Sequence, residues 1–226
     1  MFDFIDYSSF LSPKLKAWQI LSEGNNKLID YDFLRHRICN KLSIEINSLA
    51  IPVQVHSNNV KFINKSGFFE NTDGLVTDNG KMILSLQTAD CLPIFLFDKL
   101  NNIRGLIHSG WKGTKDKIVE KALNIMIQKG SDLSNIMIVI GASIHKCCYE
   151  IKDDLTPFFD KNCIYTIGSQ KYLSLQEQIL MDLSKLNIQI ENIYIDKRCT
   201  FEDTSLSSYR REKANAGRMV SLLGNF

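Results

Sequence analysis

The sequence predicts a single mixed α/β domain, with helices covering a mixed β-sheet core. Three observations predict this class: the length of 226 residues, a series of short β-prone runs in the middle of the chain, and two helical patterns with one apolar face. Hydrophobic residues make up 44% and charged residues 23%, as in globular proteins with a continuous core. No low-complexity tract, repeat or linker marks a boundary, so we expect residues 1–226 to form one domain.

The elements follow from local patterns, although the order of the strands in the sheet does not. A mixture of charged and apolar residues indicates a peripheral helix over 29–42. Thr114 is expected to cap a helix that Gly130 ends, and Ser174 with Glu177 has the spacing of a capping box at the start of another. A short helical turn is expected within 152–160. The predicted strands are 51–56, 60–63, 74–77, 82–87, 93–97, 102–108, 136–140, 190–195 and 218–223.

The charge balance excludes several classes of function. Lys and Arg total 27 against 25 Asp and Glu, which does not supply the basic stripe of a nucleic-acid-binding protein. Acidic residues near Met1 do not fit a secretory signal, and no apolar run reaches the ~18 residues of a membrane span, so we expect a cytoplasmic protein. In that reducing compartment the six cysteines are expected to be thiols or metal ligands, including the adjacent Cys147 and Cys148.

Three metal-competent side chains lie at the ends of predicted strands: His56, Cys91 and His108. Two imidazoles and one thiolate suit Zn²⁺, and a zinc ion with three protein ligands keeps a fourth position for water or substrate. The three residues are far apart in the sequence and lack the short ligand pairs of a zinc finger. A lone His or Cys is also commonly a packed or surface residue, so the residues alone leave both interpretations open.

The order of several motifs resembles one known family. They are QVH (54–56), DGLVT (73–77), TADCLP (88–93), HSGWKG (108–113), GASIHKCCYE (141–150), SYRR (208–211) and GRM (217–219). The chain resembles the YfiH-like purine nucleoside phosphorylase family, formerly called laccase-domain or multicopper polyphenol oxidase proteins. The resemblance covers about residue 50 to the C-terminus, whereas residues 1–50 lack the family's Gly-rich segment. Within the GASIHKCCYE motif, His145 and Lys146 also differ from the small residues or proline that the family has at these positions.

The resemblance implies an α/β sandwich shared with some cysteine hydrolases, with zinc on His56, Cys91 and His108. It further implies phosphorolysis of adenosine, inosine, guanosine and methylthioadenosine, and deamination of adenosine. For deamination, zinc would lower the pKa of its bound water toward ~7 for attack on the purine. Asp73 or Asp90 is the candidate proton carrier, although Asp90 could instead orient a loop or a ligating histidine.

Phosphate, the nucleophile of phosphorolysis, calls for planar cationic donors. Arg210 and Arg211 are the candidates, with Arg210 the first choice and a solvated arginine the alternative for each. Cys147 is expected to line the active site, unless it is a small buried side chain. Trp111 could stack on a purine or belong to the core. The expected ligands are thus purine nucleosides and phosphate; the sequence makes no prediction of oligomeric state.

Two other enzyme classes use the same residues differently. A copper-dependent phenol oxidase would need several histidine-rich sites, and the four histidines of the chain cannot build a multicopper centre, so Zn²⁺ is favoured over copper. A cysteine hydrolase or amidase would use Cys91 as nucleophile and His108 as base. A thiolate bound to zinc is a poor nucleophile, so the metal content separates these two classes. A binding protein without turnover is a further alternative.

Overall fold

The computed structural model describes residues 3–21 and 31–226, and within it two six-stranded sheets form the centre of the molecule. The first sheet has the order β1 (Phe4–Asp6), β2 (Lys16–Ile20), β15 (Met219–Gly224), β7 (Ile83–Thr88), β3 (Leu49–Pro52), β5 (Gly67–Phe69). The second has the order β14 (Ile193–Ile195), β10 (Ile136–Ile140), β8 (Leu92–Asp98), β9 (Arg104–Ser109), β6 (Gly74–Thr77), β4 (Val60–Phe62). Both sheets contain parallel and antiparallel pairs, which confirms the mixed α/β class.

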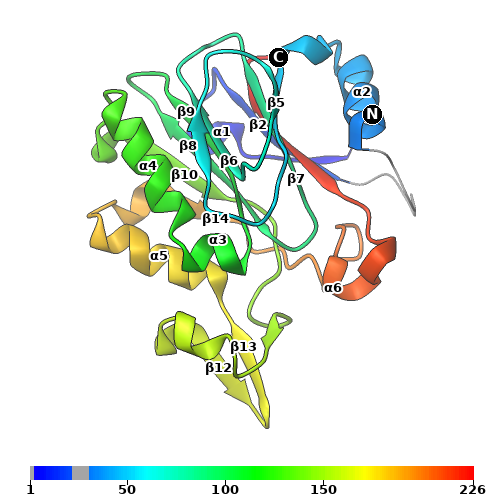
Figure 1. Ribbon diagram of the computed structural model, residues 1–226, viewed down its shortest axis with the longest axis vertical. Helices are drawn as coiled ribbons and strands as arrows, with labels where there is room; N and C mark the ends of the chain where they lie inside the picture. Colours follow the sequence, from blue (N-terminus) through cyan, green and yellow to red (C-terminus); the bar gives the residue numbers. More distant parts are fainter. Residues whose placement is uncertain (1–2, 22–30) are drawn as a thin grey trace.

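Helices cover the outer faces of the two sheets. Figure 1 shows α4 (Ile118–Gln128) and α5 (Leu175–Lys185) on one side and α2 (Tyr31–Leu42) on the other. A small antiparallel sheet of β11 (Glu150–Ile151), β13 (Gln170–Leu173) and β12 (Ile164–Ile167) projects at the bottom of the view. The remaining helices are α1 (Ser8–Leu11), α3 (Trp111–Lys115), α6 (Tyr209–Glu212), η1 (Ile46–Ser48), η2 (Leu133–Asn135), η3 (Thr156–Phe158), η4 (Lys161–Cys163), η5 (Ile190–Asn192) and η6 (Lys213–Asn215).

Strand β8 shows why the central runs are continuously apolar. Successive side chains of β8 face different cores. The even-numbered Ile94 and Leu96 pack under α4 and α5, whereas the odd-numbered Phe95 and Phe97 pack between the two sheets. A strand covered on both faces needs apolar residues at every position, not only at alternate ones. A third core lies between α2 and the outer face of the first sheet, where Ile38 packs with residues of β7 and β15.

Most central strands lie within two residues of their predicted bounds, but the first predicted strand does not. The strand expected over 51–56 ends at Pro52, because the backbone N–H groups of Val55 and His56 turn to a buried carboxylate instead of a neighbouring strand. Of the strand expected over 190–195, only Ile193–Ile195 is extended, after the turn η5. The sequence patterns did not indicate β1, β2, β5 or the small three-stranded sheet.

The helices agree with expectation in part. Ser174 caps α5 as predicted, its Oγ accepting the Glu177 N–H at 3.2 Å. The Thr114 cap is wrong: α3 begins earlier, at Trp111, and Lys117 in the left-handed region (φ 60°) separates it from α4. Part of the turn expected within 152–160 is η3, and α2 matches the helix expected over 29–42, of which residues 29–30 lie outside the described residues. None of the helices in the described ranges is long and apolar enough for a membrane span.

Candidate metal centre and its cavity

His56, Cys91 and His108 converge although they come from three separate parts of the chain. His108 belongs to β9, Cys91 lies in the short connection between β7 and β8, and His56 lies in the loop after β3. One ligand atom from each residue lies within 4.8 Å of the other two, and the two imidazole rings meet edge to face with centroids 4.8 Å apart. His108 is buried, Cys91 is half-buried and His56 is exposed, so the cluster is open on the His56 side.

Asp73 organises this cluster from behind. Its fully buried carboxylate accepts backbone N–H bonds from Val55 (3.3 Å), His56 (3.0 Å) and Ser57 (2.7 Å), and a bond from the Ser57 hydroxyl (2.7 Å). These bonds hold the His56 loop, in which His56 itself has a left-handed φ of 58°.

The same carboxylate lies 2.8 Å from Nδ1 of His108. Burial by itself raises the pKa of Asp73, but the bonds from His108 and Ser57 outweigh it and lower that pKa to about 2. An ionised carboxylate only accepts, so Nδ1 of His108 carries a proton, and Nε2 is the nitrogen that can give its lone pair to a metal once its own proton leaves.

Cys91 and His108 shift each other's pKa. Burial raises the pKa of the Cys91 thiol, but the facing imidazoles of His108 and His56 have the larger, opposite effect and lower this pKa to about 6. Burial lowers the pKa of His108, whereas the Cys91 sulfur and the Asp73 carboxylate raise it to about 9. Cys91 is therefore held as a thiolate, the form of cysteine that binds metals and attacks electrophiles.

Gly110 leaves the space that Cys91 occupies. A Cβ atom at this position would lie 2.9 Å from the Cys91 sulfur and 3.5 Å from Cδ2 of His56, a contact that would push the thiolate from its place. Gly110 is part of the HSGWKG motif, but spacing alone gave no reason to include it among the site residues.

A cavity of about 810 Å³ opens in front of the three residues. This volume is in the range of small-molecule sites, which is ~300–1,000 Å³. Among the described residues that line it, Asp90 is the one acidic side chain, against four cationic ones: Arg35, Arg210, Lys213 and Arg218. The walls also carry the aromatic rings of Phe68, Trp111, Tyr149 and Tyr209. Such a cavity suits a ligand that combines an anionic group with a flat apolar ring.

Asp90 and Arg210 meet in the cavity wall. The Asp90 carboxylate accepts the Thr200 hydroxyl at 2.6 Å and the backbone N–H of Arg210 at 2.5 Å, and Asp90 has a left-handed φ of 87°. Nη1 of Arg210 donates to the carbonyl oxygen of Glu150, while its guanidinium lies over the ring of Tyr149. Asp90 thus fixes the start of α6, from which Arg210 reaches the cavity.

Three predicted site residues lie elsewhere or play another part. Asp73 is fully buried and does not line the cavity. Arg211 does not line it either: its guanidinium donates to the carbonyl oxygens of Thr200, Phe201 and Leu206 and pairs with Glu212. Cys147 is exposed and lies in a separate cluster, described below. Trp111 both packs against the core and lines the cavity.

Several lining residues were not singled out from the sequence. Tyr149, Tyr209 and Arg218 fall inside the motifs GASIHKCCYE, SYRR and GRM, so their place in these motifs was a usable signal. Arg35 and Phe68 lie outside all of those motifs, and no local pattern points to them.

The cluster fits a zinc ion by its donors. One thiolate and two imidazoles are borderline-soft ligands, and zinc sites with three protein ligands are the usual form of catalytic sites. Ligand atoms of one tetrahedral zinc ion lie ~3–4 Å apart, given bonds of ~2.0–2.3 Å, and the observed spacing falls within 4.8 Å. The Asp73 contact to the second nitrogen of His108 is the outer support that ligating histidines usually have.

Comparison with known proteins gives consistent matches along the chain. The family model described as multi-copper polyphenol oxidoreductase laccase matches residues 32–225. A purine nucleoside phosphorylase of Clostridium acetobutylicum is 36% identical over 157 residues, which cover 67% of this chain and 66% of that protein. The purine nucleoside phosphorylase YlmD of Bacillus subtilis is 30% identical over 216 residues, covering 86% of this chain and 78% of that protein.

Solved structures show the same fold. The hypothetical protein YfiH of Bacillus licheniformis superposes with a TM-score of 0.86 at 24% identity, covering 95% of this chain and 94% of that one. YlmD of Geobacillus stearothermophilus superposes with a TM-score of 0.85 at 24% identity, covering 94% and 92%. The double-sheet arrangement with outer helices is therefore shared with these proteins.

Proposed function

Because this chain belongs to the YfiH-like family, whose laccase model matches residues 32–225, we propose that it is a zinc-dependent purine nucleoside phosphorylase. Relatives that carry the name purine nucleoside phosphorylase support an enzyme of this kind. The observation that carries the proposal is the His56–Cys91–His108 cluster at the floor of a cationic, aromatic-lined cavity.

His56, Cys91 and His108 would hold the zinc ion. When bound, zinc supplies a Lewis acid that polarises an oxygen in its fourth position. Asp73 is a positioning residue in this scheme, since it fixes the tautomer of His108 and the loop of His56 without touching substrate.

The cationic wall supplies the phosphate site. In phosphorolysis a phosphate oxygen forms a bond to C1′ of the ribose while the bond from C1′ to the purine nitrogen breaks, and the purine leaves with that electron pair. Arg210 is assigned as the phosphate-binding residue. Its planar guanidinium lines the cavity, and Asp90 holds the first turn of α6, which carries Arg210, in place. Arg211 is assigned to positioning this segment through its three carbonyl contacts.

The aromatic wall supplies the purine site. Phe68 and Tyr209, at 57% and 53% exposure, present open ring faces in the cavity and can stack on a base. Stacking depends little on the substituents at C2 and C6 of the base, which supports the proposal that adenosine, inosine, guanosine and, through its adenine base, methylthioadenosine are all substrates.

Deamination of adenosine is the second proposed activity. It requires a group that moves protons between water and the leaving amine, and Asp90 is assigned this task as the acidic side chain that lines the cavity. Asp73 is unsuited, because it is fully buried and does not line the cavity.

The test combines metal analysis with product analysis. Purified protein is assayed for zinc and copper, then incubated with adenosine, inosine or methylthioadenosine with and without phosphate, and the products are separated by chromatography. We expect phosphate-dependent release of free base and zinc bound at the His56 cluster, and Cys91→Ala should lose base release and one zinc ion per chain. Cys163→Ala, which removes a cysteine outside the cavity, is the matched control and keeps both. Base release that is independent of phosphate, or absent in the zinc-loaded protein, would contradict the proposal.

A cysteine hydrolase is the second candidate, and one observation favours it. Cys91, His108 and Asp73 form a thiol–imidazole–carboxylate series in which Asp73 holds Nδ1 of His108, the arrangement of a cysteine nucleophile with its base. Activity in a fully chelated protein, together with loss of that activity on alkylation of Cys91, would favour this candidate over the phosphorylase. A multicopper oxidase is disfavoured because the cluster contains only two histidines.

A further inference from the structure

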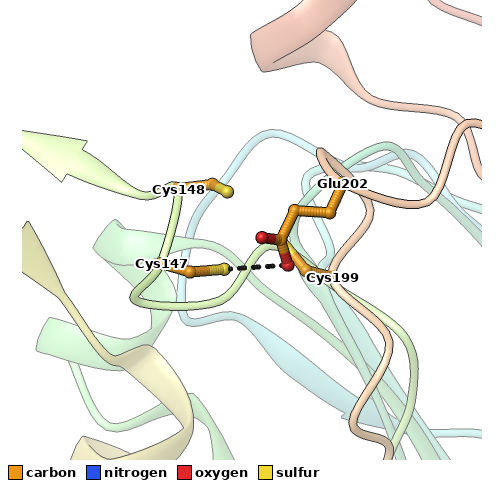
Figure 2. Close-up of side chains that lie close together, drawn as sticks. All are labelled: Cys147, Cys148, Cys199 and Glu202. Carbon is orange, nitrogen blue, oxygen red and sulfur yellow. Dashed lines mark hydrogen bonds between the residues drawn. The ribbon is translucent and has the colours of Figure 1, made fainter.

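A second group of metal-competent side chains lies outside the cavity. Cys147, Cys148, Cys199 and Glu202 each offer one ligand atom, and these four atoms all lie within 4.8 Å of one another. Figure 2 shows Cys147 and Cys148 on one turn, projecting toward Glu202 and Cys199 on the facing segment. The group shares no residue with the His56 cluster.

The ligands of this group come from two segments, as in a structural metal site. They form two short pairs, adjacent Cys147 and Cys148, then Cys199 and Glu202 three positions apart. Cys199 and Glu202 have the spacing typical of a ligand pair in a structural zinc site, whereas Cys147 and Cys148 are closer than usual; the His56 cluster draws single ligands from three segments. The donors also form a complete set of four, which leaves no open position for a substrate.

The donor chemistry selects a thiophilic divalent cation. Three thiolates and one carboxylate carry four negative charges, the same total as the four thiolates of a common structural zinc site. Hard cations such as Mg²⁺ and Ca²⁺ prefer oxygen ligands and are disfavoured by the three sulfurs.

The two ligand-bearing segments are already held side by side. The backbone N–H of His145 lies 3.4 Å from the Cys199 sulfur, and the N–H of Thr200 donates to the carbonyl oxygen of Ser143 at 3.0 Å. The N–H of Cys148 donates to the carbonyl oxygen of His145 at 3.0 Å, which closes the turn that carries both adjacent cysteines. A metal ion would therefore meet preformed ligands instead of ordering a loose loop.

The ligands are within reach of solvent. Cys147 and Glu202 are exposed, Cys148 is half-buried and only Cys199 is buried, and the sulfur of Cys147 contacts Oε2 of Glu202 at 3.3 Å (Figure 2). An ion can enter from the Cys147 side and be held on the inner side by Cys199.

We propose that Cys147, Cys148, Cys199 and Glu202 form a second metal site, structural in role, for a thiophilic divalent cation of the zinc class. As the metal–sulfur bonds form, the three thiol protons pass to solvent; no bond within the protein breaks and no redox step occurs. The site fastens the 143–150 segment to the 199–210 segment. These segments also supply Tyr149 and Arg210 to the cavity, so the ion would brace one cavity wall without touching substrate.

The test uses cobalt bound to the reduced, full-length protein, because thiolate-to-cobalt charge transfer in the near ultraviolet grows with the number of thiolate ligands. The wild-type protein should bind two cobalt ions through four thiolates. Cys91→Ala removes one ligand of the His56 cluster, so it should keep a second-site ion and about three quarters of the charge-transfer intensity.

Variants at the second site make the converse test. Cys147→Ser and Glu202→Gln change exposed side chains, so both should fold, and each should lower the cobalt and zinc affinity of this site by at least ~10-fold, as ligand-shell changes do. Cys163→Ala is the matched control and should leave both ions and the full intensity. Zinc should also raise the melting temperature of Cys91→Ala more than that of Cys91→Ala/Cys147→Ser.

Two results would overturn the proposal. One is a Cys91→Ala protein that is folded and reduced but binds no cobalt. The other is a charge-transfer band that Cys147→Ser and Glu202→Gln leave unchanged. Either result can occur while the His56 cluster still binds zinc and the phosphorylase assay succeeds, so the two proposals fail independently.

Discussion

Asp73→Asn offers the sharpest test of how the candidate centre is organised. One Asp73 oxygen accepts from His56 N–H and faces Nδ1 of His108, and the other accepts from Val55 N–H and from the N–H and hydroxyl of Ser57. Asparagine keeps the shape but offers only one acceptor oxygen. The less costly orientation keeps that oxygen on the Val55 and Ser57 side, since two of those donors are backbone N–H groups that cannot turn away.

The amide NH₂ of the introduced asparagine would then face His56 N–H and His108. The lost bond from His56 to a charged acceptor costs ~1.5–3 kcal/mol in the free energy of unfolding. His108 can satisfy the amide only by accepting at Nδ1, which moves its proton to Nε2, the nitrogen that faces the metal position. Metal affinity should therefore fall by ~10–100-fold, the range seen when outer support of a ligating histidine is removed.

The assay pairs urea unfolding with zinc competition against a chromophoric chelator, in a Cys199→Ser background so that one proposed site is measured. Asp98→Asn is the control, because Asp98 is equally buried and accepts the backbone N–H groups of Leu100 (2.9 Å) and Asn101 (3.0 Å) in a turn away from the centre. It should lose stability without losing zinc affinity. If Asp73→Asn loses stability but binds zinc as tightly as the control, Asp73 does not set the tautomer of His108.

Three further outcomes follow from the geometry. Gly110→Ala places a methyl group 2.9 Å from the Cys91 sulfur and should lower zinc affinity at least ~10-fold, measured by the same competition, with a fold intact by circular dichroism. Arg210→Ala should lower kcat/KM of phosphorolysis by ~100-fold, about 3 kcal/mol, mainly through the KM for phosphate, while deamination is spared; equal loss of both activities would count against its role. Asp196, buried against Arg198, has a pKa that burial raises but that the Arg198 contacts lower overall, so its stabilisation is present above pH ~4 and is lost as the pH falls below it. Asp196→Asn should flatten the acid side of the stability profile from urea melts, and an unchanged slope would refute this.

The strands that are buried on both faces were predicted best from the sequence, because such burial requires a continuous run of apolar residues. The strand expected over 93–97 lies inside β8, and that expected over 136–140 coincides with β10, since both are enclosed by apolar neighbours. The N-terminal strands β1 and β2 escaped prediction because they have only three and five residues. In β2, Lys16 is exposed beside buried Ala17, and one of its two neighbouring strands, β15, lies at the other end of the sequence.

The three candidate metal ligands were predicted from their residue types, whereas the residues that position them were not recognised in that role. His56, Cys91 and His108 could be named because their side chains bind metals. The role of Asp73 depends on a carboxylate lying behind two segments at once, and that of Gly110 on an absent side chain, neither of which leaves a periodic signal. Arg211 was a second candidate beside Arg210 in the motif, but in the helical turn of α6 their guanidinium groups contact different partners.

The place of β15 has a consequence for how the chain reaches this structure. This strand is inserted between β2 and β7, with Val220 paired to both Ile20 and Gln87. Until β15 docks, β2 and β7 each present an unpaired edge, and unpaired strand edges are where chains associate into aggregates. Closing a loop of nearly the full chain length is also slow, so assembly of the first sheet should be the late step of refolding. A truncation just before Met219 would keep all the metal ligands in the sequence, but it would leave the first sheet incompletely paired and the chain prone to aggregation.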